Sequence, residues 1–324
     1  MKVNQTILIT GGAGFVGSSV ARVLLNRGDR ILIVDNFNNY YDPRIKRDRI
    51  KNLEKDFNNF YIFETDITNY EEMDKIFKTE KIDKILHLAA QAGVRYSLTN
   101  PFAYQHSNYL GTLNMLELCR HHDIKDFVFA SSSSVYGANK KMPFSEDDKV
   151  DAPMSLYAAT KKGNEEKAFV YHNLFGLRCT GLRFFTVYGP WGRPDMALFL
   201  FTDAIARDKP INVFNYGNMA RDFTYVSDIV DGVVSAINRS EEHSYEIFNL
   251  AGGRSVKLLD YIAEIEKNLG KRAKKNMMPM QPGDVPVSSA DISKAEKMLG
   301  YKPQVTVEEG IKRFVEWYQD YYKI

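Results

Sequence analysis

The sequence has little cysteine and almost no net charge. Its two cysteines, Cys119 and Cys179, lie 60 positions apart, which excludes a disulfide framework and a cysteine-based zinc cluster. The 43 lysine and arginine residues are balanced by 41 aspartate and glutamate residues, so the net charge is only +2. A surface that neutralises nucleic-acid phosphates is more basic than this. We therefore expect reduced cysteines that serve packing, and no nucleic-acid partner.

Long hydrophobic runs and metal-binding spacings are also missing. No apolar stretch approaches the ~20 residues of a membrane-spanning helix, and Met1–Gln5 leads into a predicted strand without a signal-peptide pattern. The six histidines show no metal-ligand spacing, because the adjacent His121 and His122 would face different directions on a helix. The sequence thus predicts a cytoplasmic protein with no membrane partner and no bound metal.

What the chain does have is the alternation of a parallel α/β protein. In its first 130 residues, short β-branched runs alternate with amphipathic stretches, which is typical of βαβ units. Strands are predicted over residues 6–9, 30–34, 60–63, 84–88, 127–129 and 178–185. Helices are predicted over residues 16–27, 43–55, 70–79, 102–121 and 157–175. After residue 185 the elements become shorter and proline-bearing turns appear, which indicates a second, loop-rich lobe.

We predict an α/β fold in two domains, because one hydrophobic core rarely serves more than ~250–300 residues. A Rossmann-type doubly wound parallel sheet is expected over residues 1–185, with part of 227–250 returning to it. A smaller, mixed α/β C-terminal lobe is expected over residues 186–324, where it would bind the substrate.

Four short segments give local predictions. Thr68–Glu71 and Thr306–Glu309 each fit a capping box and predict helix starts. The methionine-rich segment Met277–Met280 and the aromatic segment Phe314–Tyr318 are expected in the hydrophobic core.

A glycine-rich turn follows the first strand directly. Gly11 to Gly17 fits both G-x-x-G-x-x-G and, from Gly12, G-x-G-x-x-G, and a helix comes next. Glycine permits the tight turn and lets the backbone approach a pyrophosphate, which then lies on unpaired amides at the helix N-terminus. The second strand ends at Asp35, 18 positions after Gly17, where a carboxylate accepts hydrogen bonds from ribose hydroxyls.

The acidic residue at this position favours NAD over NADP, because its charge repels a 2′-phosphate. Arg44, Arg47 and Arg49 follow closely and weaken that preference. The residues expected to bind the cofactor come from the glycine turn, the strand ends and two helices: Gly11, Gly14, Phe15, Val16, Gly17, Asp35, Asn36, Asp66, Ile67, Leu88, Ala89, Ala90, Asn108, Ser131, Tyr157 and Lys161.

A tyrosine and a lysine are placed for proton transfer. Tyr157 and Lys161 share a helix face because they are four residues apart. A phenol with a pKa near ~10 is a poor base at neutral pH, but an adjacent ammonium and a cationic nicotinamide favour its phenolate form. A hydroxyl from the serine run that ends the fifth strand would hold the substrate oxygen whose proton Tyr157 removes. We predict Ser132, Tyr157 and Lys161 as the catalytic residues.

With these motifs the sequence resembles the extended short-chain dehydrogenase/reductase family over essentially its whole length. Ser132, Tyr157 and Lys161 stand where the NAD-dependent sugar-nucleotide epimerases of that family have their catalytic residues. Within the family the chain looks most like the UDP-glucuronate 4-epimerases, in residues 35–43, 89–97 and 183–196. The resemblance implies an isomerase that epimerises UDP-glucuronate at C4 to UDP-galacturonate, through a 4-keto intermediate, in polysaccharide biosynthesis. It also implies a homodimer, formed through the helices predicted over 102–121 and 157–175.

The same resemblance implies a UDP-sugar site. Its predicted residues are Ser132, Ser133, Thr186, Arg193, Arg221 and Asp284. Arg193, with Thr186 beside it, is the candidate for the sugar carboxylate, because a guanidinium fork binds carboxylates with two hydrogen bonds. Arg221 would contact the diphosphate and Asp284 the uridine ribose. Gln281 stands where many relatives have an arginine, and which of Ser132 and Ser133 lies closer to the substrate stays open.

Other functions remain open at this stage. One is a 4-epimerase of another UDP-sugar, namely UDP-glucose/galactose or a UDP-N-acetylhexosamine or its uronate. A UDP-glucuronate decarboxylase is less favoured, and so is a 4,6-dehydratase, because Ser133 and Ser134 stand where those relatives carry acidic residues. A protein that binds NAD and a UDP-sugar without catalysis is a further alternative.

Overall fold

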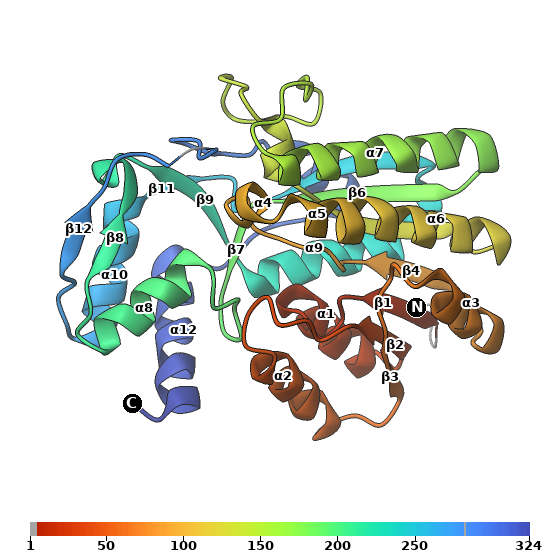
Figure 1. Ribbon diagram of the computed structural model, residues 1–324, viewed down its shortest axis with the longest axis horizontal. Coiled ribbons are helices and arrows are strands. Elements are labelled where there is room, and N and C mark those ends of the chain that lie inside the picture. Colours follow the sequence, from red (N-terminus) through yellow and green to blue (C-terminus); the bar gives the residue numbers. More distant parts are fainter. Residues whose placement is uncertain (1–4, 282) are drawn as a thin grey trace.

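The computed structural model describes residues 5–281 and 283–324 (Figure 1). The start of the predicted first domain, Met1–Asn4, and Pro282 beside the predicted uridine site lie outside the described residues. No helix in the described part of the chain is long and apolar enough to cross a membrane.

A seven-stranded sheet forms the centre of the molecule, in the order β10-β6-β5-β4-β1-β2-β3. Every pair in it is parallel. The prediction of a doubly wound α/β fold is therefore confirmed. The strands are β1 (Thr6–Thr10), β2 (Arg30–Asp35), β3 (Phe60–Glu64), β4 (Lys84–His87), β5 (Asp126–Ser132), β6 (Arg178–Phe184) and β10 (Tyr245–Leu250).

Helices cover both faces of this sheet, because its strands bury alternate side chains on opposite sides. Ile7 and Ile9 of β1 belong to the hydrophobic cluster that includes α1 and α9. Leu8 belongs to the cluster on the side of α3, α6 and α7. The helices are α1 (Phe15–Asn26), α2 (Arg44–Glu54), α3 (Tyr70–Thr79), α6 (Gly111–His121), α7 (Leu156–Phe175) and α9 (Val226–Asn238) (Figure 1).

The helix predicted over residues 102–121 is not continuous. The structure has α4 (Tyr96–Thr99), α5 (Pro101–Tyr104) and a π-helical segment η1 (Gln105–Leu110) before α6. Asn100 caps α5 by accepting a hydrogen bond from the Ala103 amide at 3.4 Å, and Pro101 occupies the first helical position. The wider turn of η1 accommodates an extra residue, a feature that is frequent at functional sites.

The remaining elements form a smaller assembly beside the sheet (Figure 1). Strands β7 (Thr186–Tyr188), β9 (Ala220–Tyr225) and β11 (Ser255–Lys257) make a mixed sheet, and β8 (Ile211–Val213) pairs with β12 (Lys275–Met277). Its helices are α8 (Ala197–Ala206), α10 (Leu258–Leu269) and α12 (Val307–Tyr322), with the short turn η3 (Phe214–Gly217). Three further elements lie against the seven-stranded sheet and its helices: η2 (Ser133–Tyr136) contacts α7, η4 (Ser240–Glu242) contacts β5 and β6, and α11 (Ser293–Leu299) contacts β10 and α9. α9 packs on α1, and β10 pairs with β6. The boundary at residue 185 stays a prediction.

The local predictions have mixed outcomes. Thr306 caps α12, accepting a hydrogen bond from the Glu309 amide at 3.3 Å, as expected. The cap of α3 is Asn69 and not Thr68, because the Thr68 hydroxyl donates instead to Asp66 at 2.7 Å.

The methionine-rich segment is wrongly predicted as core. Met277, Met278 and Met280 are all exposed, because β12 is an edge strand of a two-stranded sheet. In the aromatic segment of α12, Phe314, Val315 and Tyr318 are buried and Glu316 is exposed.

Candidate active site

A cavity of about 450 Å³ lies at the carboxyl ends of the parallel strands, where open α/β sheets bind ligands. It extends from the glycine turn after β1 to residues of the smaller assembly, such as Arg221 and Asp284. With the exception of Asn108, every residue predicted for the cofactor, the substrate or catalysis lines this cavity.

The glycine turn leaves no room for larger side chains. Gly11 adopts a φ of +69°, and a Cβ there would lie 2.8 Å from the Ala89 amide nitrogen. A Cβ at Gly17 would lie 2.3 Å from the Gly11 carbonyl oxygen. α1 begins after Gly14 with no side-chain cap. Its first amides are therefore available to an anion such as a pyrophosphate, which fits the expected dinucleotide.

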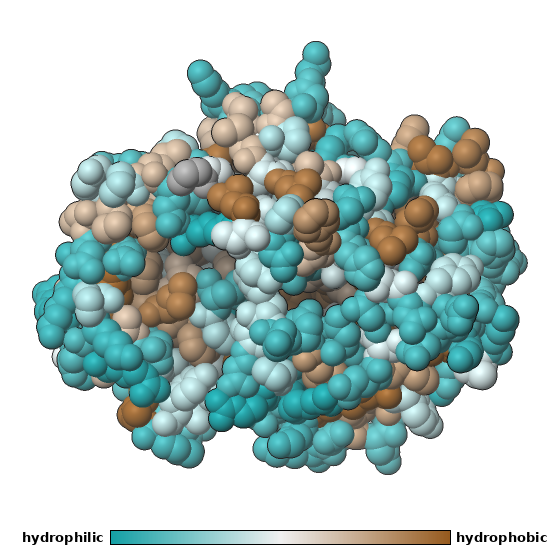
Figure 2. Space-filling model, viewed as in Figure 1, coloured by the Kyte–Doolittle hydropathy of each residue, from teal (hydrophilic) through white to brown (hydrophobic). Residues whose placement is uncertain are grey.

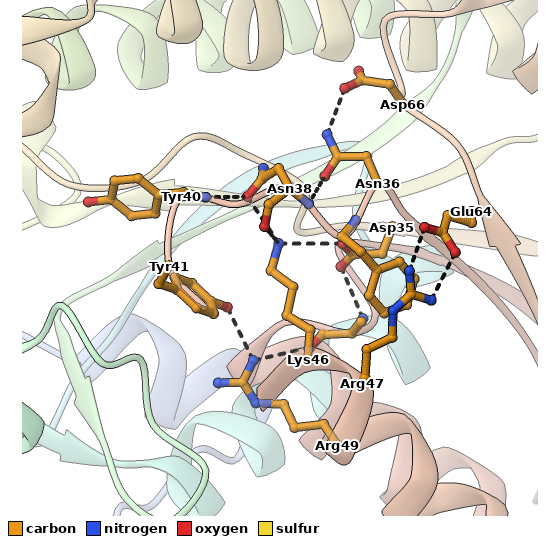
Figure 3. A network of polar contacts seen from close by, with 12 residues as sticks. Asp35, Asn36, Asn38, Tyr40, Tyr41, Lys46, Arg47, Arg49, Glu64 and Asp66 are labelled. Atoms are coloured by element: carbon orange, nitrogen blue, oxygen red, sulfur yellow. Dashed lines mark hydrogen bonds and ion pairs between the residues drawn. The ribbon is translucent and has the colours of Figure 1, made fainter. Parts of the chain in front are cut away.

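Asp35, at the end of β2, is held in place by its own neighbours. Its carboxylate accepts hydrogen bonds from the amides of Ala13 at 3.2 Å and Phe37 at 2.9 Å. The ammonium of Lys46, from α2, lies 3.7 Å from the same carboxylate, and both side chains are buried (Figure 3). Lys46 also lines the cavity and was not predicted. It lies on the apolar stripe of α2 with Ile50 and Leu53, a helical spacing that could have revealed it.

The three arginines near Asp35 serve other contacts. Arg44 pairs with Asp42 on the surface, and Arg47 pairs with Glu64 (Figure 3). Arg49 is buried and donates to main-chain carbonyls, including that of Trp191 at 2.6 Å. None of the three is among the described residues that line the cavity. The basic group closest to the predicted ribose site is therefore Lys46.

Asn36 and Asp66 lie together at the outer end of the cavity. The amide of Asn36 donates to the Asp66 carboxylate at 2.7 Å (Figure 3). Burial acts to raise the pKa of Asp66, but hydrogen bonds from Thr68 and Asn36 outweigh it and lower the pKa. Asp66 is thus a charged acceptor at neutral pH.

The proton-transfer residues meet where α7 begins beside the end of β5. Ser155 caps α7 by accepting from the Ala158 amide at 3.1 Å, which places Tyr157 in the first turn. One turn later, the buried ammonium of Lys161 donates to the Ala130 carbonyl at 2.7 Å. Burial lowers the pKa of Lys161 to about 8, against the opposing effect of Glu165.

We expected neighbouring charges to lower the pKa of the Tyr157 phenol. The protein's own groups do not produce that decrease. Burial raises the pKa of Tyr157 above 10, and the hydrogen bond with Ser132 and the charge of Arg193 only partly offset it. Among the described residues, Arg193 is the cation whose charge lowers the pKa of this phenol. Without a bound ligand, Tyr157 is protonated at neutral pH.

The serines at the end of β5 have different partners. Ser132 lies close enough to Tyr157 to lower the pKa of the phenol, and its oxygen accepts from the Ser134 amide at 3.2 Å and from the Ser134 hydroxyl at 3.0 Å. The hydroxyl of Ser131 instead donates to the Glu165 carboxylate at 2.6 Å. Ser133 lines the cavity. Of Ser132 and Ser133, it is therefore Ser132 that has a hydroxyl beside the phenol.

Arg193 already has a carboxylate partner. Its Nε lies 3.0 Å from Asp195, and Nη2 binds the second oxygen of the same carboxylate. The phenol of Tyr40 donates to that oxygen at 3.1 Å. Among residues 5–281 and 283–324, no hydrogen bond is recorded for Nη1 of Arg193. Thr186 lines the same part of the cavity.

The far end of the cavity carries the predicted diphosphate and ribose residues. The guanidinium of Arg221 donates to the carbonyls of Ala220 and Pro286, each at 3.0 Å. Asp284 accepts a hydrogen bond from Arg95 at 3.2 Å, and Arg95 stacks over the Phe214 ring with its guanidinium carbon 4.7 Å from the centroid. Arg95 was not predicted as a site residue, because one arginine in a loop has no recognisable spacing.

Asn108 lies behind the cavity and not in it. The residue is buried on η1, where its oxygen accepts from the Gln91 amide at 2.7 Å. Its amide group donates to the Gln91 carbonyl at 3.0 Å and to Thr160 at 3.1 Å. All its hydrogen bonds thus join the loop after β4 to α7. The prediction of a cofactor contact is not supported, because these bonds turn the side chain toward the protein interior.

Known proteins resemble this chain over nearly all its length. The family model described as GDP-mannose 4,6 dehydratase matches residues 8–314. The uncharacterized protein MJ1055 of Methanocaldococcus jannaschii is 53% identical over 316 residues, which cover 97% of this chain and 96% of that protein. UDP-glucuronate 4-epimerase 4 of Arabidopsis thaliana is 48% identical over 333 residues, covering 98% of this chain and 76% of that protein.

A solved structure is also closely similar. The UDP-glucuronic acid 4-epimerase of Bacillus cereus, in complex with UDP-glucuronic acid and NAD, has a TM-score of 0.92 and 36% sequence identity. The match covers 98% of this chain and 100% of that chain.

The tight glycine turn generates a first prediction. Gly17→Ala should lower the free energy of unfolding by ~1–3 kcal/mol, because a Cβ would overlap the Gly11 carbonyl and strain the turn. Urea unfolding followed by circular dichroism measures the change. Ser19→Ala, on the same helix, adds no atom and should change stability by less than ~0.5 kcal/mol. Equal stability of the two variants would contradict the steric argument.

Proposed function

Because the chain belongs to the GDP-mannose 4,6-dehydratase family of extended short-chain dehydrogenases/reductases, we propose that it is an NAD-dependent UDP-glucuronate 4-epimerase. The observation that carries this proposal is a single cavity lined by the glycine turn, by Ser132 and Tyr157, and by Arg193. The reaction interconverts UDP-glucuronate and UDP-galacturonate, with no net oxidation or reduction. The cytoplasmic location expected from the sequence stays part of this proposal.

The residues around the glycine turn would hold NAD. The free amides of α1 receive the pyrophosphate, and Asp35, with Lys46 beside it, receives the adenine ribose. When bound, NAD supplies a hydride acceptor for C4 of the sugar and a positive charge that favours the phenolate of Tyr157. The protein alone keeps this phenol protonated, so the base forms only in the loaded site.

Ser132 and Tyr157 act on the 4-hydroxyl of the sugar. The Ser132 hydroxyl holds O4, and the Tyr157 phenolate takes its proton as C4 becomes a carbonyl. The same phenol returns the proton after the 4-keto sugar has turned its other face toward the cofactor. Lys161 would support the phenolate with its charge and would hold the nicotinamide ribose of the bound cofactor.

Arg193 and Thr186 hold the sugar carboxylate. The intermediate is a β-keto acid, which loses CO₂ when its carboxylate bond aligns with the carbonyl π system. A guanidinium fixed by Asp195 restrains the rotation of the carboxylate that binds it. Ser133, directly after Ser132, contacts the sugar. At the other end of the cavity, Arg221 binds the diphosphate and Asp284 the uridine ribose.

A second candidate is a 4-epimerase of a neutral UDP-sugar. The observation that favours it is the ion pair between Arg193 and Asp195, which already satisfies the fork of the guanidinium. A neutral sugar would leave that pair intact, whereas a uronate must bind through Nη1 or share the arginine. Incubation with each UDP-sugar and separation of the products decides between the two candidates.

The function is tested by product analysis with UDP-glucuronate and no added reductant. We expect UDP-galacturonate to form, and Tyr157→Phe to lower kcat at least ~10²-fold, because the variant has no group to take the proton. NAD content and thermal stability of the variant serve as controls. If turnover with UDP-glucuronate is never observed, or survives in Tyr157→Phe, the proposal is wrong.

The carboxylate contact gives a separate prediction. Arg193→Ala should raise KM for UDP-glucuronate at least ~10-fold, because a charge-assisted hydrogen bond contributes ~1.5–3 kcal/mol. A decarboxylated UDP-pentose should appear among the products. Arg207→Ala, an exposed arginine on α8 that also pairs with an aspartate, is the matched control. Unchanged KM and product purity would remove Arg193 from the site.

We also propose that the enzyme is a homodimer through α4 to α7. Large apolar side chains are exposed on these helices, among them Phe102 with 83%, Leu174 with 64% and Leu98 with 56% of its surface accessible. Figure 2 shows hydrophobic side chains over this part of the molecule. An exposed apolar face of this kind fits a second copy of the same chain, as the family resemblance implies.

Light scattering tests the dimer. The parent protein should have twice the mass of the chain, and Phe102→Glu should shift it toward the monomer by placing a charge in the apolar contact. Leu200→Glu, at an apolar residue of α8 that is 50% exposed, should leave the mass unchanged. A monomeric parent at micromolar concentration would contradict the proposed dimer.

A further inference from the structure

A buried ion pair lies directly behind the proton-transfer residues, and the proposed chemistry does not use it. Glu165 follows Lys161 by one turn of α7, and Arg183 comes from β6. The guanidinium binds both oxygens of the carboxylate, with Nε to Oε1 and Nη2 to Oε2 each at 2.9 Å. Only 2% of Glu165 and 3% of Arg183 is exposed. Burying two charges is costly, and hydrophobic residues would often pack there at no loss of stability.

The pair is joined to the strand that carries Ser132. Ser131 of β5 and Arg183 of β6 are direct neighbours in the parallel ladder, so their side chains point to the same face of the sheet. The Ser131 hydroxyl donates to Oε1 of Glu165 at 2.6 Å. Because Lys161 donates to the carbonyl of the preceding residue, Ala130, two successive residues of β5 are attached to α7.

The charges around Lys161 can be followed from element to element. On α7 it faces Glu165, on β5 the neutral Ala130 carbonyl and Ser131, and on β4 the buried His87. Burial, with a smaller contribution from Lys161, lowers the pKa of His87 to about 3, so this histidine is neutral. Glu165 is the one anion that acts on the ammonium among the described residues.

Glu165 has other partners besides Lys161. On its far side it faces Arg183, whose Nη1 donates to the hydroxyl of Tyr136 at 3.0 Å. The Tyr245 hydroxyl donates to the main-chain carbonyl of Glu165 at 3.0 Å. A second carboxylate, Glu146, lies near Arg183 and accepts from the Asn249 amide at 2.7 Å. Glu165 thus stands between two cations, and the bidentate contact is with Arg183.

We propose that Glu165 and Arg183 are a positioning pair for Lys161: Glu165 keeps the lysine charged, and Arg183 keeps Glu165 from drawing the ammonium away from Tyr157. The pair acts through Lys161 and touches neither the sugar nor the cofactor. This inference rests on the role of Lys161 in the proposed function. It deepens that function by assigning the buried charges that set the protonation of the lysine.

The direction of each charge effect follows from electrostatics. Burial already lowers the pKa of Lys161 to about 8, so a small further change removes its proton near neutral pH. Removing the anion leaves Arg183 unpaired and pushes the lysine toward its neutral form. Removing the guanidinium leaves an uncompensated anion beside the ammonium, which keeps it charged to higher pH but pulls it toward Glu165. Removing both restores the balance of charge.

The test is a charge cycle with Glu165→Gln, Arg183→Met and the double variant. Two readouts follow the proton of Lys161 in the purified protein as isolated. One is the alkaline limb of kcat/KM against pH. The other is an NMR titration of ε-¹³C-lysine, in which the signal absent from Lys161→Met is that of Lys161. A charged carboxylate or guanidinium close to the Lys161 ammonium shifts the pKa of the lysine by ~1 unit or more.

The expected results have opposite signs. Glu165→Gln should move both readouts to lower pH by ~1 unit or more, and Arg183→Met should move the lysine titration upward by a similar amount. The double variant should titrate within ~0.5 unit of the parent, since both charges are gone. Glu166→Gln, on the exposed side of the same turn, is the matched control and should shift neither readout.

A purely structural role would give another pattern. The single variants would then lose activity with no opposite shifts, and the double variant would be at least as impaired as either one, which would overturn the proposal. If an unpaired buried charge prevents a single variant from folding, Ser131→Ala replaces it. That change keeps both charges but removes a hydrogen-bond donor from Glu165, so the carboxylate should act more strongly on the ammonium. The pKa of Lys161 should therefore rise, and an absent or downward shift would overturn the proposal.

The lysine titration needs no substrate, which separates the two proposals. If UDP-glucuronate is not converted, the proposed function is wrong. The NMR titrations of the Glu165 and Arg183 variants still decide whether this pair sets the pKa of Lys161. If conversion occurs but the cycle shows no opposite shifts, only the positioning pair is wrong.

Discussion

The attachment of α7 to the end of β5 determines where the reactive groups of the cavity lie. Tyr157 and Lys161 are fixed to each other by helical geometry, but neither would face the sheet end without a contact across the two elements. The bond from Lys161 to the Ala130 carbonyl, at 2.7 Å in a buried setting, provides that contact. It brings Ser132, two residues along β5, within hydrogen-bond reach of the phenol. The glycine turn follows β1, which only β4 separates from β5 in the parallel sheet, so the sheet itself places the turn at the same edge as Tyr157 and Ser132.

Burial is what makes these groups sensitive to their neighbours. In water, Tyr157 and Lys161 would titrate within a unit of each other near pH ~10. In the protein, burial raises the pKa of the phenol and lowers that of the ammonium, because the charged form of each is disfavoured away from water. Burial therefore shifts both Tyr157 and Lys161 toward their neutral forms, and nearby charges oppose that shift. This explains why the cluster behind the pair carries charges where apolar side chains would have packed.

Much of this arrangement could be predicted from the sequence. The six predicted strands are all present, because fully buried parallel strands have apolar runs that are easy to recognise. Because parallel strands end at the same edge of the sheet, the predicted residues that follow those strands lie close together. Arg95 could not be separated from other loop cations by spacing, whereas Lys46 could have been recognised by its place on the apolar stripe of α2. The cofactor contact of Asn108 stays a prediction; in the structure its side chain bonds to Gln91 and Thr160, and no pattern in the sequence marks the π-helical turn on which it lies. The pKa of Tyr157 depends on burial, which motifs do not report.

The position of Arg193 shows why a binding group can be paired with an anion in advance. Only 22% of the Arg193 side chain is exposed, so without a partner its guanidinium would lose much of its hydration, which costs free energy. Asp195 compensates that charge, and the Tyr40 phenol also donates to the Asp195 carboxylate. The arginine is thus rigid and oriented before any ligand arrives, at the expense of part of its attraction for a second carboxylate. Such a site binds the sugar carboxylate less tightly but holds it in a fixed orientation. This suits a reaction whose keto intermediate must rotate in the cavity without losing CO₂.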